Sequence, residues 1–204
     1  MTITLETELV RQCAPTLAGL KAASLFRFVF RPEDSPFAQI AEIRRSLEPK
    51  EIRLEVLSYD CIRQSALLYV YRPHRLSILL QDPESRSFLK RQGYGGTTCQ
   101  EILDQMALRL ARRDPFPHEI GILLDYPLED VKAYMASPRD KGVCSGCWKA
   151  YGNRERAACY FAKCQKCTRI YWRCYCAGTP LSRLAVAYNK QASSRFDGRK
   201  DEKT

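Results

Sequence analysis

Two short apolar runs separated by a polar turn limit the folds open to this chain. Residues 52–59 (IRLEVLSY) and 65–71 (SALLYVY) are rich in aliphatic and aromatic side chains, and a short polar connection lies between them. This pattern predicts two strands joined as a β-hairpin. Residues 25–30 (LFRFVF) alternate apolar and basic side chains and predict a third strand. Residues 147–151 are a fourth candidate strand.

Most of the remaining chain has the periodicity and capping residues of helices. Residues 5–13 predict a short helix that ends before Pro15, and Ser35 followed by Pro36 marks the start of another. Further helix starts are indicated at Thr97 or Thr98, Pro117, Pro127, Asn153 and Thr179. The sequence therefore predicts an α+β fold, in which a sheet of three to four strands packs with about seven helices. We expect a single domain over residues 1–190 and a disordered polar tail over 191–204.

The apolar segments and the N-terminus bear on where the protein resides. The longest apolar runs, such as residues 65–71 and 120–124, are far shorter than the ~20 residues that a membrane span needs. Residues 1–10 carry two glutamates and no basic stretch, so no export signal is indicated. We therefore expect a cytoplasmic protein with no membrane association. In that reducing compartment, ten cysteines are expected to bind metal, take part in redox chemistry or pack in the core.

The excess positive charge is concentrated in one segment. Of the net charge of +10, residues 1–138 contribute nothing, because they hold 18 basic and 18 acidic side chains. Residues 139–190 hold 11 basic and 2 acidic side chains, together with seven of the ten cysteines. A local positive surface attracts polyanions, so this segment indicates a nucleic-acid or acidic protein partner. A solvated helix face has the same composition and remains the alternative.

Four cysteines have the spacing of a zinc site. Cys144 and Cys147 form one CxxC pair, and Cys164 and Cys167 form a second after sixteen residues. Four thiolates on two short pairs can surround zinc as a tetrahedron, so zinc is the candidate cofactor. The second pair, however, lies in a predicted helix and follows the spacing of an apolar stripe, which is typical of buried thiols that only pack. A redox pair and an iron-linked role stay open as well.

A basic aromatic stretch within the same segment is the candidate nucleic-acid site. Arg169, Tyr171, Trp172 and Arg173 alternate cations with rings, as in proteins that bind single strands by stacking and phosphate contacts. A packed helix whose arginines extend to water gives the same pattern.

The segment from Glu119 to Met135 has the pattern of a helix-turn-helix. Its second helix would begin with Glu129 and Asp130, whose carboxylates would repel the DNA backbone, so we predict a structural helical hairpin. His118 beside Glu119 is a candidate general base or metal ligand. No other catalytic motif accompanies this pair, and a capping or partly buried histidine is the alternative reading.

Three stretches resemble a known bacterial family in their order and spacing. They are residues 66–72 followed by Leu76 (ALLYVYR…L), residues 116–131 (FPHEIGILLDYPLEDV) and residues 144–161 (CSGCWKAYGNRERAACYF). Together they resemble the uncharacterised family named domain of unknown function 3793, over about residues 15–184. The resemblance implies a cytosolic protein of Gram-positive anaerobes, linked to flavodoxin and ferrous-iron uptake genes, and it implies no activity.

The chain departs from that family pattern at two positions. Cys147 stands where the pattern has tyrosine, and Asp125 stands where it has glycine. A four-cysteine zinc site would therefore not be general to the family.

Three hypotheses about function follow from the sequence. The first is a non-enzymatic, thiol-rich protein that binds zinc or iron and acts through a partner in redox or iron metabolism. The second is a nucleic-acid-binding module that uses the basic segment 139–190. The third is an enzyme that uses His118 and Glu119.

Overall fold

The chain folds around a strand that is buried on both faces. In the computed structural model, which describes residues 3–96, 98–112 and 116–187, β3 (Ser65–Tyr71) lies between β1 (Ala23–Val29) and β2 (Arg53–Asp60) in an antiparallel sheet. Every residue of β3 is buried. Its even-numbered side chains join one apolar core and its odd-numbered side chains join another, because successive residues of a strand point to opposite faces.

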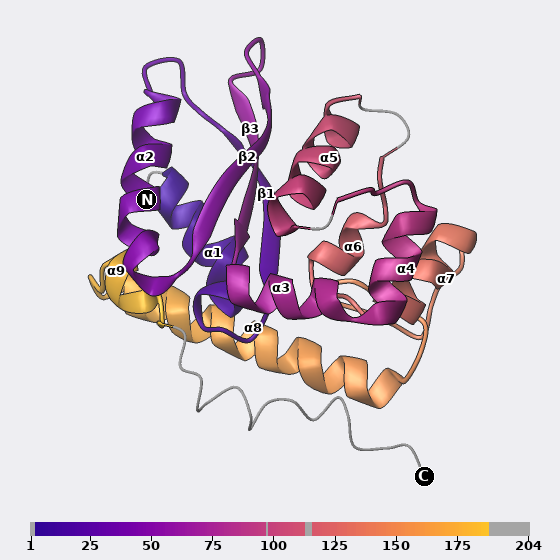
Figure 1. The fold of residues 1–204 in the computed structure, drawn as a ribbon. Helices are drawn as coiled ribbons and strands as arrows, with labels where there is room; N and C mark the ends of the chain where they lie inside the picture. Colours follow the sequence, from indigo (N-terminus) through magenta and orange to yellow (C-terminus); the bar gives the residue numbers. More distant parts are fainter. Residues whose placement is uncertain (1–2, 97, 113–115, 188–204) are drawn as a thin grey trace.

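Helices cover both faces of this sheet, so the molecule has three layers (Figure 1). The helices on the face of the even-numbered residues are α1 (Leu5–Leu17), α2 (Pro36–Leu47), α8 (Arg154–Cys176) and α9 (Leu181–Leu184). The helices on the other face are α3 (Pro73–Gln81), α4 (Pro83–Arg91), α5 (Cys99–Ala111), α6 (Ile120–Leu123) and α7 (Leu128–Ala136). A 3₁₀ turn, η1 (Glu48–Lys50), precedes β2. The predicted α+β class is confirmed, with nine α-helices in the described part of the chain.

The three main predicted strands are confirmed, and the fourth candidate does not join their sheet. Within residues 147–151 only β5 (Lys149–Ala150) is extended, and it pairs with β4 (Cys144–Ser145) in a separate two-stranded hairpin. The physical reason is a competing anchor, because this segment is hydrogen-bonded to Asp130 of α7 and has no bond to an edge of the main sheet.

Helix α1 passes through Pro15, so the predicted end before that residue is wrong. The helix ends at Leu17 and is followed by the C-cap Ala18 and by Gly19, which has a φ of +78°. The amide of Leu20 donates to the carbonyl of Pro15 (2.8 Å) and the amide of Gly19 donates to the carbonyl of Thr16 (3.1 Å). This is the Schellman arrangement, in which glycine takes the left-handed conformation without a steric penalty. Pro15 removes only one backbone N–H donor from the last turn of the helix. The hydrogen bonds of the Schellman motif stabilise that turn.

A buried arginine joins three distant parts of the chain. Arg72, only 3 % exposed, follows β3 and donates to the carbonyls of Thr16 (2.6 Å), Leu17 (2.6 Å) and Val186 (2.8 Å). Burial lowers the pKa of its guanidinium to about 10. Arg72 thus satisfies the free carbonyls at the end of α1 and fixes the chain beyond α9 to the same place.

Two further predictions concern segments outside this core. None of the described helices is long and apolar enough to cross a bilayer. The predicted disordered tail over 191–204 lies outside the described residues.

Replacing Arg72 by methionine should destabilise the fold. The carbonyls of Thr16, Leu17 and Val186 would each lose one hydrogen bond from the guanidinium, so we expect Arg72→Met to lower the free energy of unfolding by about 3 kcal/mol. Denaturant-induced unfolding of the purified chain measures this change. Arg45→Met, at an exposed position of α2, is the matched control and should change the stability by less than about 0.5 kcal/mol. Equal stabilities of the two variants would contradict the role assigned to Arg72.

Candidate functional site

Cys147 lies at the tip of the β4–β5 hairpin. The turn is closed by the amide of Gly146, which donates to the carbonyl of Trp148 (2.9 Å). A Cβ atom at Gly146 would overlap the ring of Phe161 on α8. Glycine is therefore required for the hairpin tip to lie directly against α8, and this close approach brings Cys147 to the helix.

One buried carboxylate holds the hairpin in place. Asp130 of α7, which is 5 % exposed, accepts from the indole Nε1 of Trp148 (2.7 Å) and from the amides of Tyr151 (2.7 Å) and Gly152 (3.0 Å). A carboxylate that accepts three N–H groups forms strong, charge-assisted hydrogen bonds. Asp130 therefore fixes the residues on both sides of β5, and with them the position of the hairpin tip.

Aromatic packing supports the same arrangement. The indole of Trp148 lies among three rings, with centroid distances of 4.6 Å to Phe161, 5.1 Å to Tyr126 and 5.3 Å to Tyr160. Phe161 and Tyr160 belong to α8, and Tyr126 lies between α6 and α7. The hairpin is thus wedged between α7 and α8.

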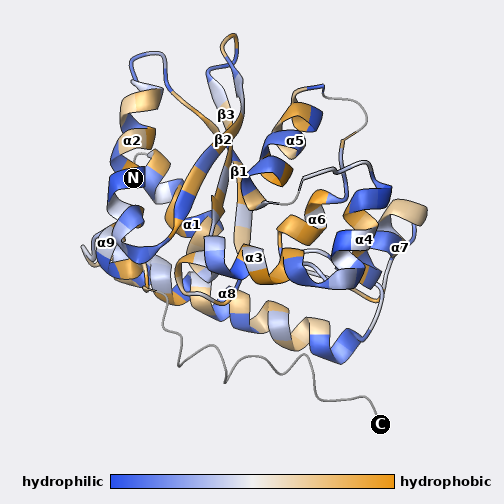
Figure 2. Cartoon of the chain, viewed as in Figure 1, coloured by the Kyte–Doolittle hydropathy of each residue, from blue (hydrophilic) through white to orange (hydrophobic). Residues whose placement is uncertain are grey.

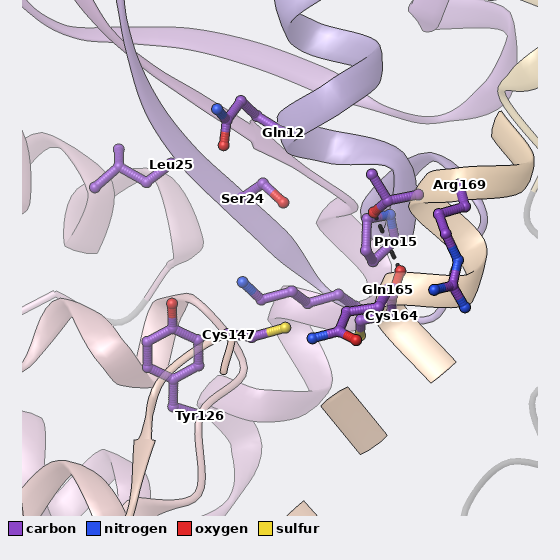
Figure 3. Close-up of a pocket in the computed structure, with 11 residues that line it drawn as sticks. Gln12, Pro15, Ser24, Leu25, Tyr126, Cys147, Cys164, Gln165 and Arg169 are labelled. Carbon is purple, nitrogen blue, oxygen red and sulfur yellow. Dashed lines mark hydrogen bonds between the residues drawn. The ribbon is translucent and has the colours of Figure 1, made fainter. Parts of the chain in front are cut away.

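This packing brings two cysteines from distant parts of the sequence close together. Cys164 is on the inner face of α8 and only 2 % exposed, while Cys147 is partly exposed. The two thiols are near enough for each to shift the pKa of the other. Both line a cavity of about 530 Å³, and Figure 3 shows the Cys147 sulfur between Tyr126 on one side and Arg169 on the other.

A buried lysine completes this site. Lys21, 7 % exposed, lines the same cavity, and its Nζ lies 4.8 Å from the centroid of the Tyr126 ring. The residues beside Lys21 hold its backbone, because the carbonyl of Leu20 accepts from the Tyr160 hydroxyl (3.2 Å) and the amide of Ala22 donates to Asp125 Oδ2 (3.0 Å). Lys21 is therefore placed by contacts with α8 and with the α6–α7 turn.

The charges of Lys21 and Cys147 stabilise each other. Burial lowers the pKa of the Lys21 ammonium, and the nearby sulfur of Cys147 is the largest influence that raises it, ahead of Cys13, Asp125 and Cys164. Cys164, helped by the charge of Lys21, lowers the pKa of Cys147 to about 7 from its ordinary value of 9.0. Cys147 and burial raise the pKa of Cys164. Of the two thiols, Cys147 is therefore the one that loses its proton at the lower pH.

The four cysteines predicted to bind zinc are not brought together. Cys147 and Cys164 lie close together, whereas Cys144 packs beside the small core of Ala150, Ala157 and Phe161. Cys167 is buried, and burial raises the pKa of its thiol to about 11. Over the described residues, no three His, Cys, Asp or Glu side chains are grouped so that they could hold a metal ion. One reason is that α8 is continuous, so Cys164 and Cys167 point about 60° apart around its axis.

The predicted nucleic-acid residues divide between the inside and the outside of α8. Tyr171 and Trp172 are partly buried against the core formed by α1, and Arg11 lies 5.3 Å from the Trp172 ring. Arg169 and Arg173 are exposed. The hydrophilic positions of α8 are seen along the helix in Figure 2. The rings thus contribute to packing, and the exposed cations form a separate surface.

The structure separates His118 from Glu119. His118 is exposed and its ring lies 5.0 Å from that of Tyr134, whereas Glu119 is buried and accepts from Tyr94 and Arg109, both at 3.0 Å. The two side chains therefore do not share a pocket. The segment after them forms the predicted helical hairpin of α6 and α7, in which Asp125 has a φ of +65°. This left-handed conformation favours glycine, so Asp125 occupies a backbone position that glycine would take more easily.

Sequence reasoning missed Lys21. The signal available was a single cation inside a run of small and apolar residues from Leu17 to Phe26. A lysine in such a run is buried only where a compensating charge is present. The position of that charge, on Cys147 more than 120 residues away, could not be read from the sequence.

The fold and the site define a three-layer α+β protein in which two thiols and a buried lysine line one cavity. The family model described as "Protein of unknown function (DUF3793)" matches residues 9–185, and the chain belongs to this family. No curated protein and no solved structure matches the chain.

The reactivity of Cys147 should depend on pH in a way that reports Lys21. Iodoacetamide alkylates the thiolate, so the rate at Cys147 should fall as the pH drops through about 7. Lys21→Met removes the neighbouring positive charge and should move this midpoint upward, toward 9.0. Peptide mass spectrometry over a series of pH values measures the rate at Cys147 alone. Lys166→Met, at an exposed position of α8, should leave the midpoint unchanged. A wild-type midpoint at the ordinary thiol value would contradict the proposed thiolate.

Proposed function

We propose that this chain is a thiol–disulfide redox protein in which Cys147 and Cys164 alternate between two thiols and one disulfide. The observation that carries the proposal is that Cys147 of the hairpin and Cys164 of α8 line one cavity, together with the buried side chain of Lys21. A thiolate beside a cation is the nucleophile of thiol–disulfide exchange, and a second thiol in contact with it can resolve the mixed disulfide.

The reaction follows from the two different positions of the sulfurs. The Cys147 thiolate attacks one sulfur of an oxidised disulfide, that S–S bond breaks, and the leaving thiolate takes a proton from water. Cys164 then gives up its proton and attacks the Cys147 sulfur, and the second leaving thiolate is protonated in turn. The net change oxidises two protein thiols and reduces one disulfide. The partly exposed Cys147 meets the partner first, and the buried Cys164 is reached only from within the protein.

The proposed chemistry suits a reducing, cytoplasmic location. Three of the ten cysteines, Cys61, Cys159 and Cys176, are exposed. Exposed thiols stay reduced where glutathione or thioredoxin systems operate. We infer that the chain acts there through a redox partner that restores its thiols.

Zinc or iron binding is the weaker form of the same thiol hypothesis. Zinc in structural sites takes four ligands, and only two thiols among the described residues are close together here. The nearby charge of Lys21 also offsets the negative charge that would attract a metal ion. Metal analysis of the purified chain, before any treatment with chelators, tests it directly.

A nucleic-acid role has one observation in its favour. Helix α8 carries several exposed cations and one acidic residue, Glu155. The cations are Arg154, Arg156, Lys163, Lys166, Arg169 and Arg173. The inward packing of Tyr171 and Trp172 removes the stacking surface that single-strand binders use. Nucleic acid that co-purifies with the chain and leaves as salt is raised would support this alternative.

The redox proposal predicts one defined disulfide. Mild oxidation of the reduced chain with hydroxyethyl disulfide should join Cys147 to Cys164, because these thiols line the same cavity. Peptide mapping without reduction identifies the linked pair. Cys164→Ser should instead accumulate a mixed disulfide on Cys147, and Cys147→Ser should form neither product.

Cys159→Ser is the matched control for these variants, since Cys159 is an exposed cysteine of the same helix. It should form the Cys147–Cys164 disulfide as the unchanged chain does. A disulfide that maps to another pair of cysteines, or a Cys147 that stays unmodified, would contradict the proposal.

A further inference from the structure

The cavity that exposes Cys147 is positively charged. Lys21 and Arg169 both line it, and none of the described residues around it is acidic. With Cys147 as a thiolate, the lining keeps one net positive charge. The remaining polar groups that face the cavity, among them Gln12, Ser24 and Gln165, can donate hydrogen bonds.

The size and shape of this cavity fit a small molecule. Its volume of about 530 Å³ lies within the range of roughly 300–1,000 Å³ that is typical of small-ligand pockets. Cys147 is set back at the tip of a hairpin pressed against α8, so a compact disulfide can reach its sulfur more easily than the surface of a folded protein can.

The two cations occupy different depths. Lys21 is buried beside the sulfurs, while Arg169 is exposed on α8. In Figure 3 Arg169 lies on the opposite side of the Cys147 sulfur from Tyr126. A guanidinium forms bidentate hydrogen bonds with a carboxylate, so a ligand whose sulfur meets Cys147 can place its carboxylate against Arg169.

From these observations we infer that the cavity selects small disulfides that carry carboxylates. This inference rests on the proposed thiol–disulfide function and names its substrate class. Cys147 attacks one sulfur of the bound disulfide, and the carboxylated thiol that leaves takes the electron pair of the broken bond and then a proton. Cys164 resolves the mixed disulfide, and a second carboxylated thiol is released. Arg169 acts as a positioning residue, and Lys21 offsets the negative charge that gathers at the sulfurs.

Three disulfides of similar size but different charge test this selectivity. They are dithiodipropionate with two carboxylates, hydroxyethyl disulfide with no charge, and cystamine with two ammonium groups. Each rate of Cys147–Cys164 disulfide formation is divided by the rate of the same disulfide with N-acetylcysteinamide, a free thiol without charge, which removes differences in intrinsic reactivity. We expect the corrected rate for dithiodipropionate to exceed that for cystamine by about tenfold, the effect of roughly one favourable charge interaction in a partly buried site.

Two arginine variants locate the source of the selectivity. Arg169→Gln should remove most of the preference for the anion and raise the apparent KM for dithiodipropionate, and it should lower the corrected rate with dithiodipropionate far more than the rate with hydroxyethyl disulfide. Arg173→Gln, which removes an exposed cation of α8 outside the cavity, should keep the preference.

The other possible results would refute the substrate class, the role of the cavity or the redox function. Equal corrected rates for the three compounds, with the Cys147–Cys164 disulfide still formed, would refute the substrate class and leave the redox function standing. Equal losses in the two arginine variants would refute the cavity as the source of selectivity. The absence of that disulfide with every compound would refute the redox function itself.

Discussion

The carboxylate of Asp130 is the contact on which the candidate site depends. The β4–β5 hairpin has only two residues in each strand, and a hairpin of that size is not stable alone in water. Three hydrogen bonds to one buried side chain, together with the packing of Trp148 against rings of α8, replace the missing neighbours. The position of Cys147 is therefore a property of the whole C-terminal arrangement and of α7, which belongs to the other layer of the fold.

The pairing of Lys21 with Cys147 explains how a lysine is tolerated in this interior. An ammonium loses its hydration when it is buried, and the loss is offset only by an opposite charge or by aromatic faces. Lys21 has both, because the Cys147 sulfur is its strongest charge partner and the Tyr126 ring lies 4.8 Å away. Each charge also has other support, since Cys164 lowers the pKa of Cys147 more than Lys21 does, and Asp125 favours the charged form of Lys21. The pairing joins the loop before β1 to the hairpin more than a hundred residues later.

Local signals in the sequence were sufficient for much of the fold. The predicted strand over 65–71 coincides with β3, since a continuous apolar run suits a strand buried on both faces. The helix predicted after Asn153 coincides with α8, whose first turn is capped by the Asn153 side chain and whose end is followed by Gly178. Pro15 misled the prediction for α1, because the Schellman motif that ends this helix depends on Gly19 and not on the proline.

The candidate site was less accessible to the same reasoning. The spacing of four cysteines grouped Cys144 with Cys147 and Cys164 with Cys167, as neighbours in the sequence. In the structure, Cys147 from the first pair lies near Cys164 from the second. The hairpin approaches α8 only at its tip, and only one of the two thiols of the second pair points toward that tip. The contact partner of a thiol is decided by packing between elements, and the spacing within an element does not contain that information.

The hydrogen bonds of Arg72 to three carbonyls join parts of the chain that are synthesised at very different times. Its donors reach the end of α1 and Val186, which stand near opposite ends of the described chain. During synthesis from the N-terminus, the sheet is complete once Tyr71 has emerged, yet α8, which covers part of one face, follows some eighty residues later. The face that α1 and α2 cover therefore lacks α8 and α9 until the last third of the polypeptide has been made. Cys147 and Cys164 belong to that last third, so their pairing is among the last contacts that become available to the growing chain.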